Sequence, residues 1–282
     1  MPEVHTLMTG IAMGESPRWH DDRLWFADWG AGEVIAVGLD GASEVVLRRQ
    51  SLPLSIDWLP DGRLLLVSGS DGLLLRREHD GSLVTHADLT RTSAKPWNDI
   101  VVDARGNAYV GTIGFEFPGG EFAPGSLALV TPDGSARQVA DGLAFPNGLA
   151  ITTDNRTLIV AESYADRLTA FDIGDDGCLS NRRAWADVPG DHPDGICLDA
   201  DDALWYADVG GRRCVRVREG GEVLQMVDTD LGCFACMLGG TDGTTLFIVA
   251  NAWPLPTDMT TELGRTGRVL YVDAPAARAG RP

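Results

Sequence analysis

The chain has 282 residues, with 23 basic and 41 acidic side chains that give a formal net charge of −18. So acidic a chain disfavours nucleic acid and anionic membranes as partners and makes a cation the more natural ligand. The sequence has neither a basic start followed by an apolar segment nor an apolar run of about 18 residues, so we expect a cytoplasmic protein without a membrane span.

A unit of about 40 to 50 residues is repeated six times along the chain. Each copy begins with an anchor residue and a short apolar segment, continues through a turn rich in Asp, Gly or Asn, and enters a second apolar strand. In chain order the copies read GESPRWHDDRLWFADW, LSIDWLPDGRLLLVSG, NDIVVDARGNAYVGTI, NGLAITTDNRTLIVAES, DGICLDADDALWYADV and FACMLGGTDGTTLFIVAN. The anchors are Glu15, Ser55, Asn98, Asn147, Asp194 and Ala235.

Turn residues and further strands complete each copy. Seven or eight residues after its anchor, each copy has a residue type that tolerates positive φ: Asp22, Gly62, Gly106, Asn155, Asp202 and Gly243. Segments such as VIAVGLDG and LALVTPDG add strands, so each copy holds about four. We therefore predict an all-β fold in which residues 1–282 form one six-bladed β-propeller of antiparallel blades. A β-sandwich remains an alternative, and the sequence does not prove that residues 4–9 pair with residues 268–272 to close the propeller.

The anchors carry the predicted chemistry. Positions of equal phase in successive blades lie at equal height around one axis, so the anchors form a ring. Glu15, Asn98, Asn147 and Asp194 supply side-chain oxygens to this ring, and its two carboxylates would repel each other unless a cation lay between them. We predict a divalent metal on the central axis held by these four residues, Ca²⁺ first, with Mn²⁺, Zn²⁺, Mg²⁺ and Fe²⁺ left open.

A simpler interpretation is that the anchors only form turns. Asn147-Gly148 and Asp194-Gly195 are common turn dipeptides. Glu15 and Asn98 precede no glycine, however, and occupy the same phase of the repeat. The turn interpretation does not explain that coincidence.

Four motifs around the anchors resemble one known family. They occur in the expected order as Gly14-Glu15-Ser16-Pro17-Arg18-Trp19, Asn98-Asp99, Pro146-Asn147-Gly148 and Pro193-Asp194-Gly195. Over nearly its whole length the chain resembles the senescence marker protein/gluconolactonase family, also called regucalcin-like or luciferin-regenerating-enzyme-like. The resemblance implies a six-bladed propeller whose catalytic divalent ion is held by Glu15, Asn147 and Asp194, often with Asn98. It also implies lactonase activity, in which the metal polarises the ester carbonyl and a carboxylate such as Asp194 activates water.

One departure from the family bears on the substrate. Many sugar lactonases of this family carry Arg two residues before the blade-three Asn, where this chain has Pro96. We therefore expect a lactone or ester less polar than a sugar lactone, bound at Asn98 against an aromatic wall. The predicted wall residues are Trp97, Phe115, Phe117 and Phe122, the last three within GFEFPGGEFAPG, which is our candidate lid.

For ester hydrolysis a base must lie near the metal. The candidates are Asp194, then Asp99 beside the ring, then His192, for which a surface turn is the plainer interpretation. Cys233 and Cys236 form a Cys-x-x-Cys pair that we interpret as core thiols rather than a redox pair. The alternatives to a lactonase are a phosphotriesterase-like hydrolase and a non-enzymatic calcium-binding propeller.

Overall fold

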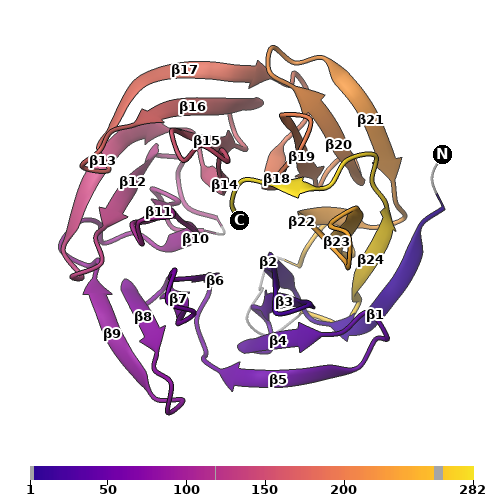
Figure 1. Ribbon diagram of the computed structural model, residues 1–282, viewed down its shortest axis with the longest axis horizontal. Coiled ribbons are helices and arrows are strands. Elements are labelled where there is room, and N and C mark those ends of the chain that lie inside the picture. Colours follow the sequence, from indigo (N-terminus) through magenta and orange to yellow (C-terminus); the bar gives the residue numbers. More distant parts are fainter. Residues whose placement is uncertain (1–2, 118, 257–262) are drawn as a thin grey trace.

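The computed structural model describes residues 3–117, 119–256 and 263–282. Within these residues six antiparallel sheets are arranged around one axis (Figure 1), five of four strands and one with a short fifth strand. The predicted six-bladed β-propeller is therefore confirmed. No helix among these residues is long and apolar enough to span a membrane.

In every sheet four strands follow one another from the axis outward, and we call them the innermost, second, third and outer strands. The innermost strands are β2 (Gly14–His20), β6 (Leu54–Trp58), β10 (Trp97–Val102), β14 (Pro146–Ile151), β18 (Pro193–Asp199) and β22 (Gly232–Gly239). The second strands are β3 (Arg23–Asp28), β7 (Leu64–Ser68), β11 (Ala108–Thr112), β15 (Thr157–Glu162), β19 (Ala203–Asp208) and β23 (Thr245–Asn251). The third strands are β4 (Glu33–Val37), β8 (Leu73–Arg77), β12 (Gly125–Val130), β16 (Arg167–Ile173), β20 (Arg213–Arg218) and β24 (Gly267–Asp273). The outer strands are β5 (Ser43–Arg48), β9 (Leu83–Asp88), β13 (Ala136–Leu143), β17 (Leu179–Asp187), β21 (Val223–Asp228) and β1 (His5–Ile11).

The turns between the first and second strands follow the sequence pattern. All six predicted turn residues have positive φ, and they are Asp22, Gly62, Gly106, Asn155, Asp202 and Gly243. This conformation costs little for Gly and is tolerated by Asp and Asn. The same turn chemistry thus starts every second strand.

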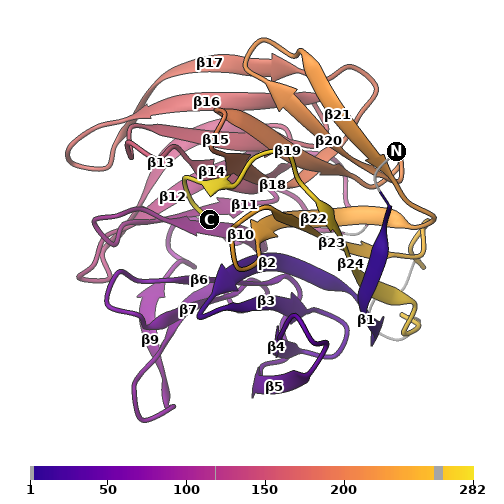
Figure 2. The same cartoon turned by 45° about the vertical axis from the view of Figure 1, so that its right-hand side comes forward.

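The last sheet joins the two ends of the described chain. β1 pairs antiparallel with β24, so the first strand completes the sheet of β22, β23 and β24 (Figure 2). The sequence left open whether residues 4–9 pair with residues 268–272, and the structure shows that His5–Ile11 pairs with Gly267–Tyr271. After β24 the chain crosses the axis (Figure 1), and β25 (Arg278–Ala279) pairs with the last two residues of β18, Leu198 and Asp199.

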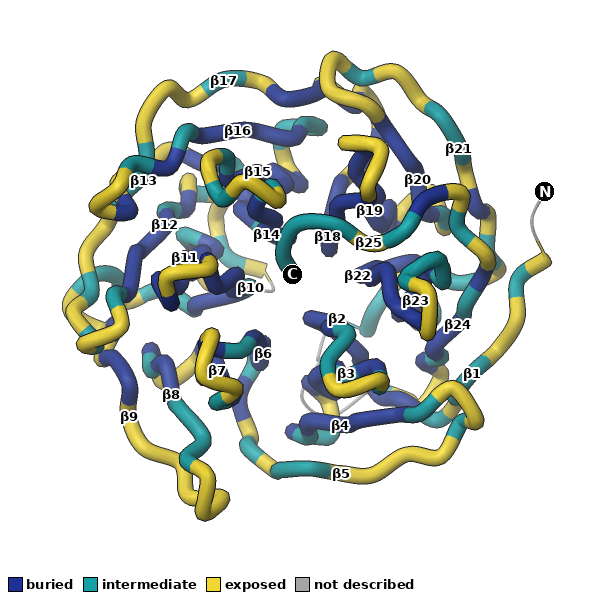
Figure 3. The backbone as a smooth tube through the Cα atoms, in the orientation of Figure 1, coloured by how far each residue is buried: buried dark blue, intermediate teal, exposed yellow. Residues whose placement is uncertain are grey.

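The core lies between neighbouring sheets. Apolar side chains of the inner three strands are buried there, whereas the outer strands are largely exposed (Figure 3). Cys233 and Cys236 are buried in this core, and all five cysteines are free. Their interpretation as core thiols agrees with this placement.

Candidate functional site

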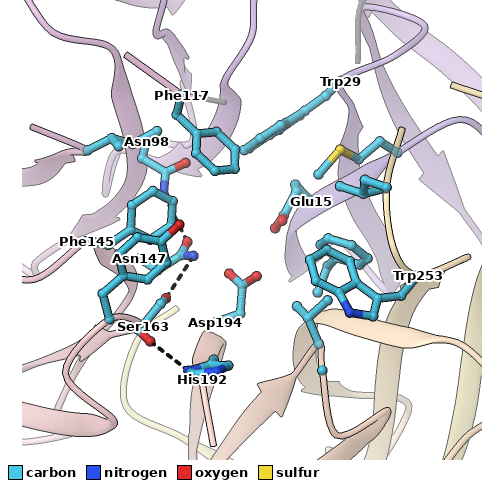
Figure 4. A pocket seen from close by; sticks show the side chains of 17 residues that line it. Glu15, Trp29, Asn98, Phe117, Phe145, Asn147, Ser163, His192, Asp194 and Trp253 are labelled. Atoms are coloured by element: carbon cyan, nitrogen blue, oxygen red, sulfur yellow. Dashed lines mark hydrogen bonds between the residues drawn. The ribbon is translucent and has the colours of Figure 1, made fainter. Parts of the chain in front are cut away.

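The innermost strands bring the four predicted oxygen ligands to one hollow on the axis. β2 supplies Glu15, β10 supplies Asn98, β14 supplies Asn147 and β18 supplies Asp194. Their carboxylate and amide groups face the same space (Figure 4). Glu15 and Asp194 are each 7% exposed and Asn98 is 2% exposed, so a ligand in this hollow is largely shielded from water.

Strand irregularities occur at the ring positions. The register shifts at the anchor in β2, β10, β14, β18 and β22, between the inner strand and its neighbour. β6 pairs with β7 without a shift, and its anchor is Ser55. Because a bulge re-aims the side chains next to it, these shifts help to turn the four oxygen-bearing anchors toward the axis.

The Asn-Gly and Asp-Gly dipeptides are not turns. Both lie within strands, and neither Gly148 nor Gly195 has positive φ. A Cβ on Gly148 would lie 2.4 Å from the carbonyl oxygen of Asp194, and one on Gly195 would lie 2.4 Å from Cβ of Ala235. These glycines therefore allow neighbouring innermost strands to approach closely, and the turn interpretation is wrong for both motifs.

A chain of hydrogen bonds orients the two amides. Asn98 Nδ2 donates to Asn147 Oδ1 at 2.9 Å, and Asn147 Nδ2 donates to Ser163 Oγ at 3.3 Å. Ser163 Oγ in turn donates to the carbonyl of Pro193 at 2.8 Å, and Figure 4 shows the two bonds that join Asn98, Asn147 and Ser163. Both Nδ2 groups act as donors within this chain, so a cation would meet the amide oxygens, and Asn147 Oδ1, which already accepts from Asn98, keeps one lone pair for it.

The two carboxylates of the ring have few compensating partners within the described part of the chain, and Glu15 Oε2 accepts only a long hydrogen bond, 3.3 Å, from the backbone N–H of Ser16. Asp194 Oδ1 is buried and has no hydrogen-bond partner among the described residues. Burial raises the pKa of Glu15, and the charges of Asp194 and Asp99 raise it further. Burial likewise raises the pKa of Asp194, with Asp99 the next cause. A bound divalent cation would satisfy the orphaned oxygen and offset this repulsion, so the donor set fits such an ion.

Above the ring lies a cavity of about 240 Å³. Its polar lining residues are Glu15, Asn98, Asn147, Ser163, His192 and Asp194, and Tyr164 also lines it. The remaining side chains of its wall are apolar or aromatic, and they are Met13, Trp29, Ile113, Phe117, Phe145, Val209, Phe234, Trp253 and Leu255. The site is thus a polar floor beneath a largely apolar wall.

The predicted aromatic wall is correct only in part. Phe117 lines the cavity and contacts Phe145, with 5.2 Å between the ring centroids. Phe115 is buried behind this pair, and Phe122 is 50% exposed and packs on Tyr164. Neither is among the residues that line the cavity. Of the candidate lid, Pro118 lies outside the described residues.

Trp97 does not belong to the site. It is fully buried and packs between two sheets with residues such as Leu65 and Val110. Its neighbour Asn98 points to the axis, and consecutive side chains of a strand point to opposite faces. The assignment of Trp97 to substrate binding is therefore wrong.

The sequence interpretation missed most of the wall. Trp29, Ile113, Val209 and Trp253 come one or two residues after the last residue of a second strand, as does Tyr164. They therefore share one phase of the repeat, as the anchors do. Three of the aligned copies already end on Trp29, Ile113 and Val209, and extending two others by one or two residues reaches Tyr164 and Trp253.

The three predicted bases have different surroundings. Asp194 lines the cavity, whereas Asp99 lies in a narrow space beneath the ring. Asp99 Oδ1 accepts from Arg18 Nη2 at 3.1 Å, and its Oδ2 accepts from the backbone N–H of Leu149 at 3.3 Å. This placement does not bring Asp99 to the cavity and argues against its role as the base. His192 lines the cavity, with Nδ1 3.2 Å from Asp166 Oδ1.

The chain is similar to known proteins over most of its length. Residues 13–252 match the sequence model of the SMP-30/Gluconolactonase/LRE-like region. Regucalcin from Xenopus laevis is 28% identical over 286 residues, which cover 95% of each chain. Diisopropyl-fluorophosphatase from Loligo vulgaris is 28% identical over 206 residues, 64% of each chain. A solved gluconolactonase from Xanthomonas campestris is 25% identical with a TM-score of 0.79, covering 97% of this chain and 90% of its own.

Proposed function

Because the chain belongs to the SMP-30/gluconolactonase/LRE-like family, we propose that it is a metal-dependent lactonase that hydrolyses a small cyclic ester less polar than a sugar lactone. The observation that carries this proposal is the buried Oδ1 of Asp194, which has no hydrogen-bond partner among the described residues and lies at the floor of a cavity with a largely apolar wall. A cation site and a binding space for an uncharged organic group therefore adjoin. Ester hydrolysis assisted by a metal needs both.

The residues of the ring have distinct roles in this proposal. Glu15, Asn98, Asn147 and Asp194 hold the ion, with Ca²⁺ favoured by the all-oxygen donor set. When bound, the ion supplies a Lewis acid for the ester carbonyl and lowers the pKa of water. Asp194 is the base, since among the two carboxylates proposed for that role it alone lines the cavity. It accepts a proton from the water that adds to the carbonyl carbon and returns one to the alkoxide oxygen as the lactone C–O bond breaks.

The cavity wall supports the less polar substrate. Trp29, Phe117 and Trp253 present aromatic surface above the ring (Figure 4). The hydroxyl groups of a sugar would be desolvated against this surface with few hydrogen-bond partners, and such burial is unfavourable. An alkyl or aryl substituent on the lactone would instead bury apolar area there.

The test is hydrolysis of aliphatic, aromatic and sugar-derived lactones, followed with a pH indicator on chelator-stripped protein to which single divalent ions are returned. We expect metal-dependent turnover that is fastest with lactones bearing an apolar substituent. Asp194→Asn protein, prepared identically, controls for a contaminating esterase. Exclusive turnover of sugar lactones would overturn the substrate class, and absence of turnover by a metal-loaded protein would leave a calcium-binding propeller without enzymatic activity.

A phosphotriesterase-like activity is the second candidate, because the match to diisopropyl-fluorophosphatase covers 64% of both chains. An ion that polarises a carbonyl can also polarise a phosphoryl oxygen. Organophosphate triesters should be assayed in parallel under the same metal conditions. Turnover of triesters well above that of every lactone would replace the lactonase proposal with this one.

A further inference from the structure

Arg18 crosses the space directly beneath the ring. It lies on β2 three residues after Glu15 and is 4% exposed. Its Nη2 donates to the carbonyl of Ile100 at 2.5 Å and to Asp99 at 3.1 Å, both on β10. Its Nη1 donates to the carbonyl of Pro17 at 2.9 Å. A full positive charge is thereby fixed between two innermost strands that are not neighbours in the propeller.

Two carboxylates beneath the ring face this guanidinium. Asp99 pairs with it directly, and Asp57 Oδ1 lies 3.9 Å from Arg18 Nε. Asp57 also accepts backbone N–H groups of Trp58 at 2.8 Å and Val102 at 2.7 Å. Asp99 is therefore paired within the protein, and Asp57 is compensated in part, since burial raises its pKa more than Arg18 and these N–H groups lower it.

The guanidinium and the ring share one space. Arg18 and Asp99 line the same narrow cavity as Glu15, Asn98 and Asn147. Charges separated by so little largely buried protein interact more strongly than charges in water. Both charges therefore act on the ring. The positive charge of Arg18 offsets the negative charge of its partner Asp99.

We propose that Arg18 is a positioning residue that holds Asp99 beneath the ring and thereby limits the affinity of the ring for a divalent cation. Arg18 does so by pairing with the third nearby carboxylate, which would otherwise add its charge to those of Glu15 and Asp194. The cation then has two charged ligands and stays incompletely neutralised. This inference rests on the proposed metal site, and it concerns Arg18, which that proposal does not use.

The experiment is a double-mutant cycle on Ca²⁺ affinity, measured by isothermal titration calorimetry at fixed pH and ionic strength. Arg18→Met removes the charge but keeps an apolar stem, and it should tighten Ca²⁺ binding on the order of tenfold. Asp99→Asn should weaken binding by a similar factor. Arg18→Met/Asp99→Asn should return affinity to about the wild-type value, and Arg18→Lys should stay near wild type because it retains the charge.

Three outcomes would count against the inference or its premise in different ways. Weaker binding by Arg18→Met, with a double variant weaker still, would show a purely structural role and overturn it. Should Arg18→Met fail to fold by circular dichroism, the comparison of Asp99→Asn with the double variant decides, because removing Arg18 in that background must still tighten binding. Wild-type protein that binds no divalent cation would overturn the metal site itself.

Discussion

The two sides of the ring differ in both polarity and charge balance. Above it, Glu15 and Asp194 face a largely apolar cavity, and Asp194 Oδ1 has no partner among the described residues. Below it, Asp57 and Asp99 are held by Arg18 and by backbone N–H groups. Both sides are built from the same innermost strands. The contrast therefore arises from individual side chains and not from the fold.

The contrast indicates where the structure is prepared for a ligand. Buried carboxylates are normally paired, and an unpaired one carries an electrostatic penalty until a cation binds. On the lower side the guanidinium of Arg18 already supplies a positive charge, so no bound metal ion is needed there. Binding should thus change the electrostatics of the upper side much more than those of the lower side.

The largest expected effect is the loss of cation binding when one of the two ring carboxylates is neutralised. Asp194→Asn removes a charged ligand, so Ca²⁺ affinity should fall at least about 100-fold, and lactone turnover should fall with it. Calorimetry and the lactone assay measure the two. Ser55→Ala changes the anchor of β6, which has no register shift, and should leave Ca²⁺ affinity and lactone turnover near wild type. An equal loss in this variant would mean that any change in the ring reduces binding.

A second, smaller effect concerns stability against pH in the presence of a chelator. Because the pKa values of Glu15 and Asp194 are raised in the folded state, this state retains protons that the unfolded chain releases above about pH 4. The free energy of unfolding contributed by the pair should therefore fall as the pH rises from there through the raised pKa values. The fall for each carboxyl is about 1.4 kcal/mol for every pH unit that separates its folded-state pKa from its unfolded-state pKa.

Chemical denaturation of wild type and Glu15→Gln/Asp194→Asn measures this slope. The difference between the two proteins isolates the pair, since the other carboxylates act in both. The variant should be the more stable protein at pH 7 to 8 without metal, and saturating Ca²⁺ should flatten the wild-type slope. Identical pH profiles without metal would mean that the pair is already compensated.

The smallest expected effect is a change in KM, which distinguishes a residue of the cavity wall from a residue of the core between the blades. Phe117→Ala should raise KM for an apolar lactone about tenfold, with little change in kcat, because binding area is lost. Trp97→Ala is the comparison: it should lower the free energy of unfolding by about 3–5 kcal/mol and leave KM of the folded protein unchanged. A KM effect from Trp97→Ala alone would return that residue to the site.

The repeat in the sequence predicts the frame of the molecule well. The anchors occupy the innermost strands, and the six turn residues have positive φ. These features depend on local chemistry and on period, and both can be read from residue types. The convergence of Glu15, Asn98, Asn147 and Asp194 follows from them.

Other parts of the site depend on geometry that residue types do not encode. Trp97 was misassigned because the strand turns it away from the axis next to Asn98. Arg18 lies within the first motif, but nothing in the sequence pattern indicated that its side chain reaches Asp99 across the channel. The wall was partly missed because its residues lie in irregular segments after the second strands, where the expectation centred on one long loop.

The pairing of β1 with β24 has a consequence for how the protein is made. His5 pairs with Tyr271, so β1 is synthesised long before the strand that pairs with it. Until then β1 is an unpaired edge, and such edges are prone to pair with other chains. During synthesis on the ribosome, the interval before β24 emerges is therefore when β1 is most exposed to aggregation, and a delay in translation between the two strands prolongs that interval.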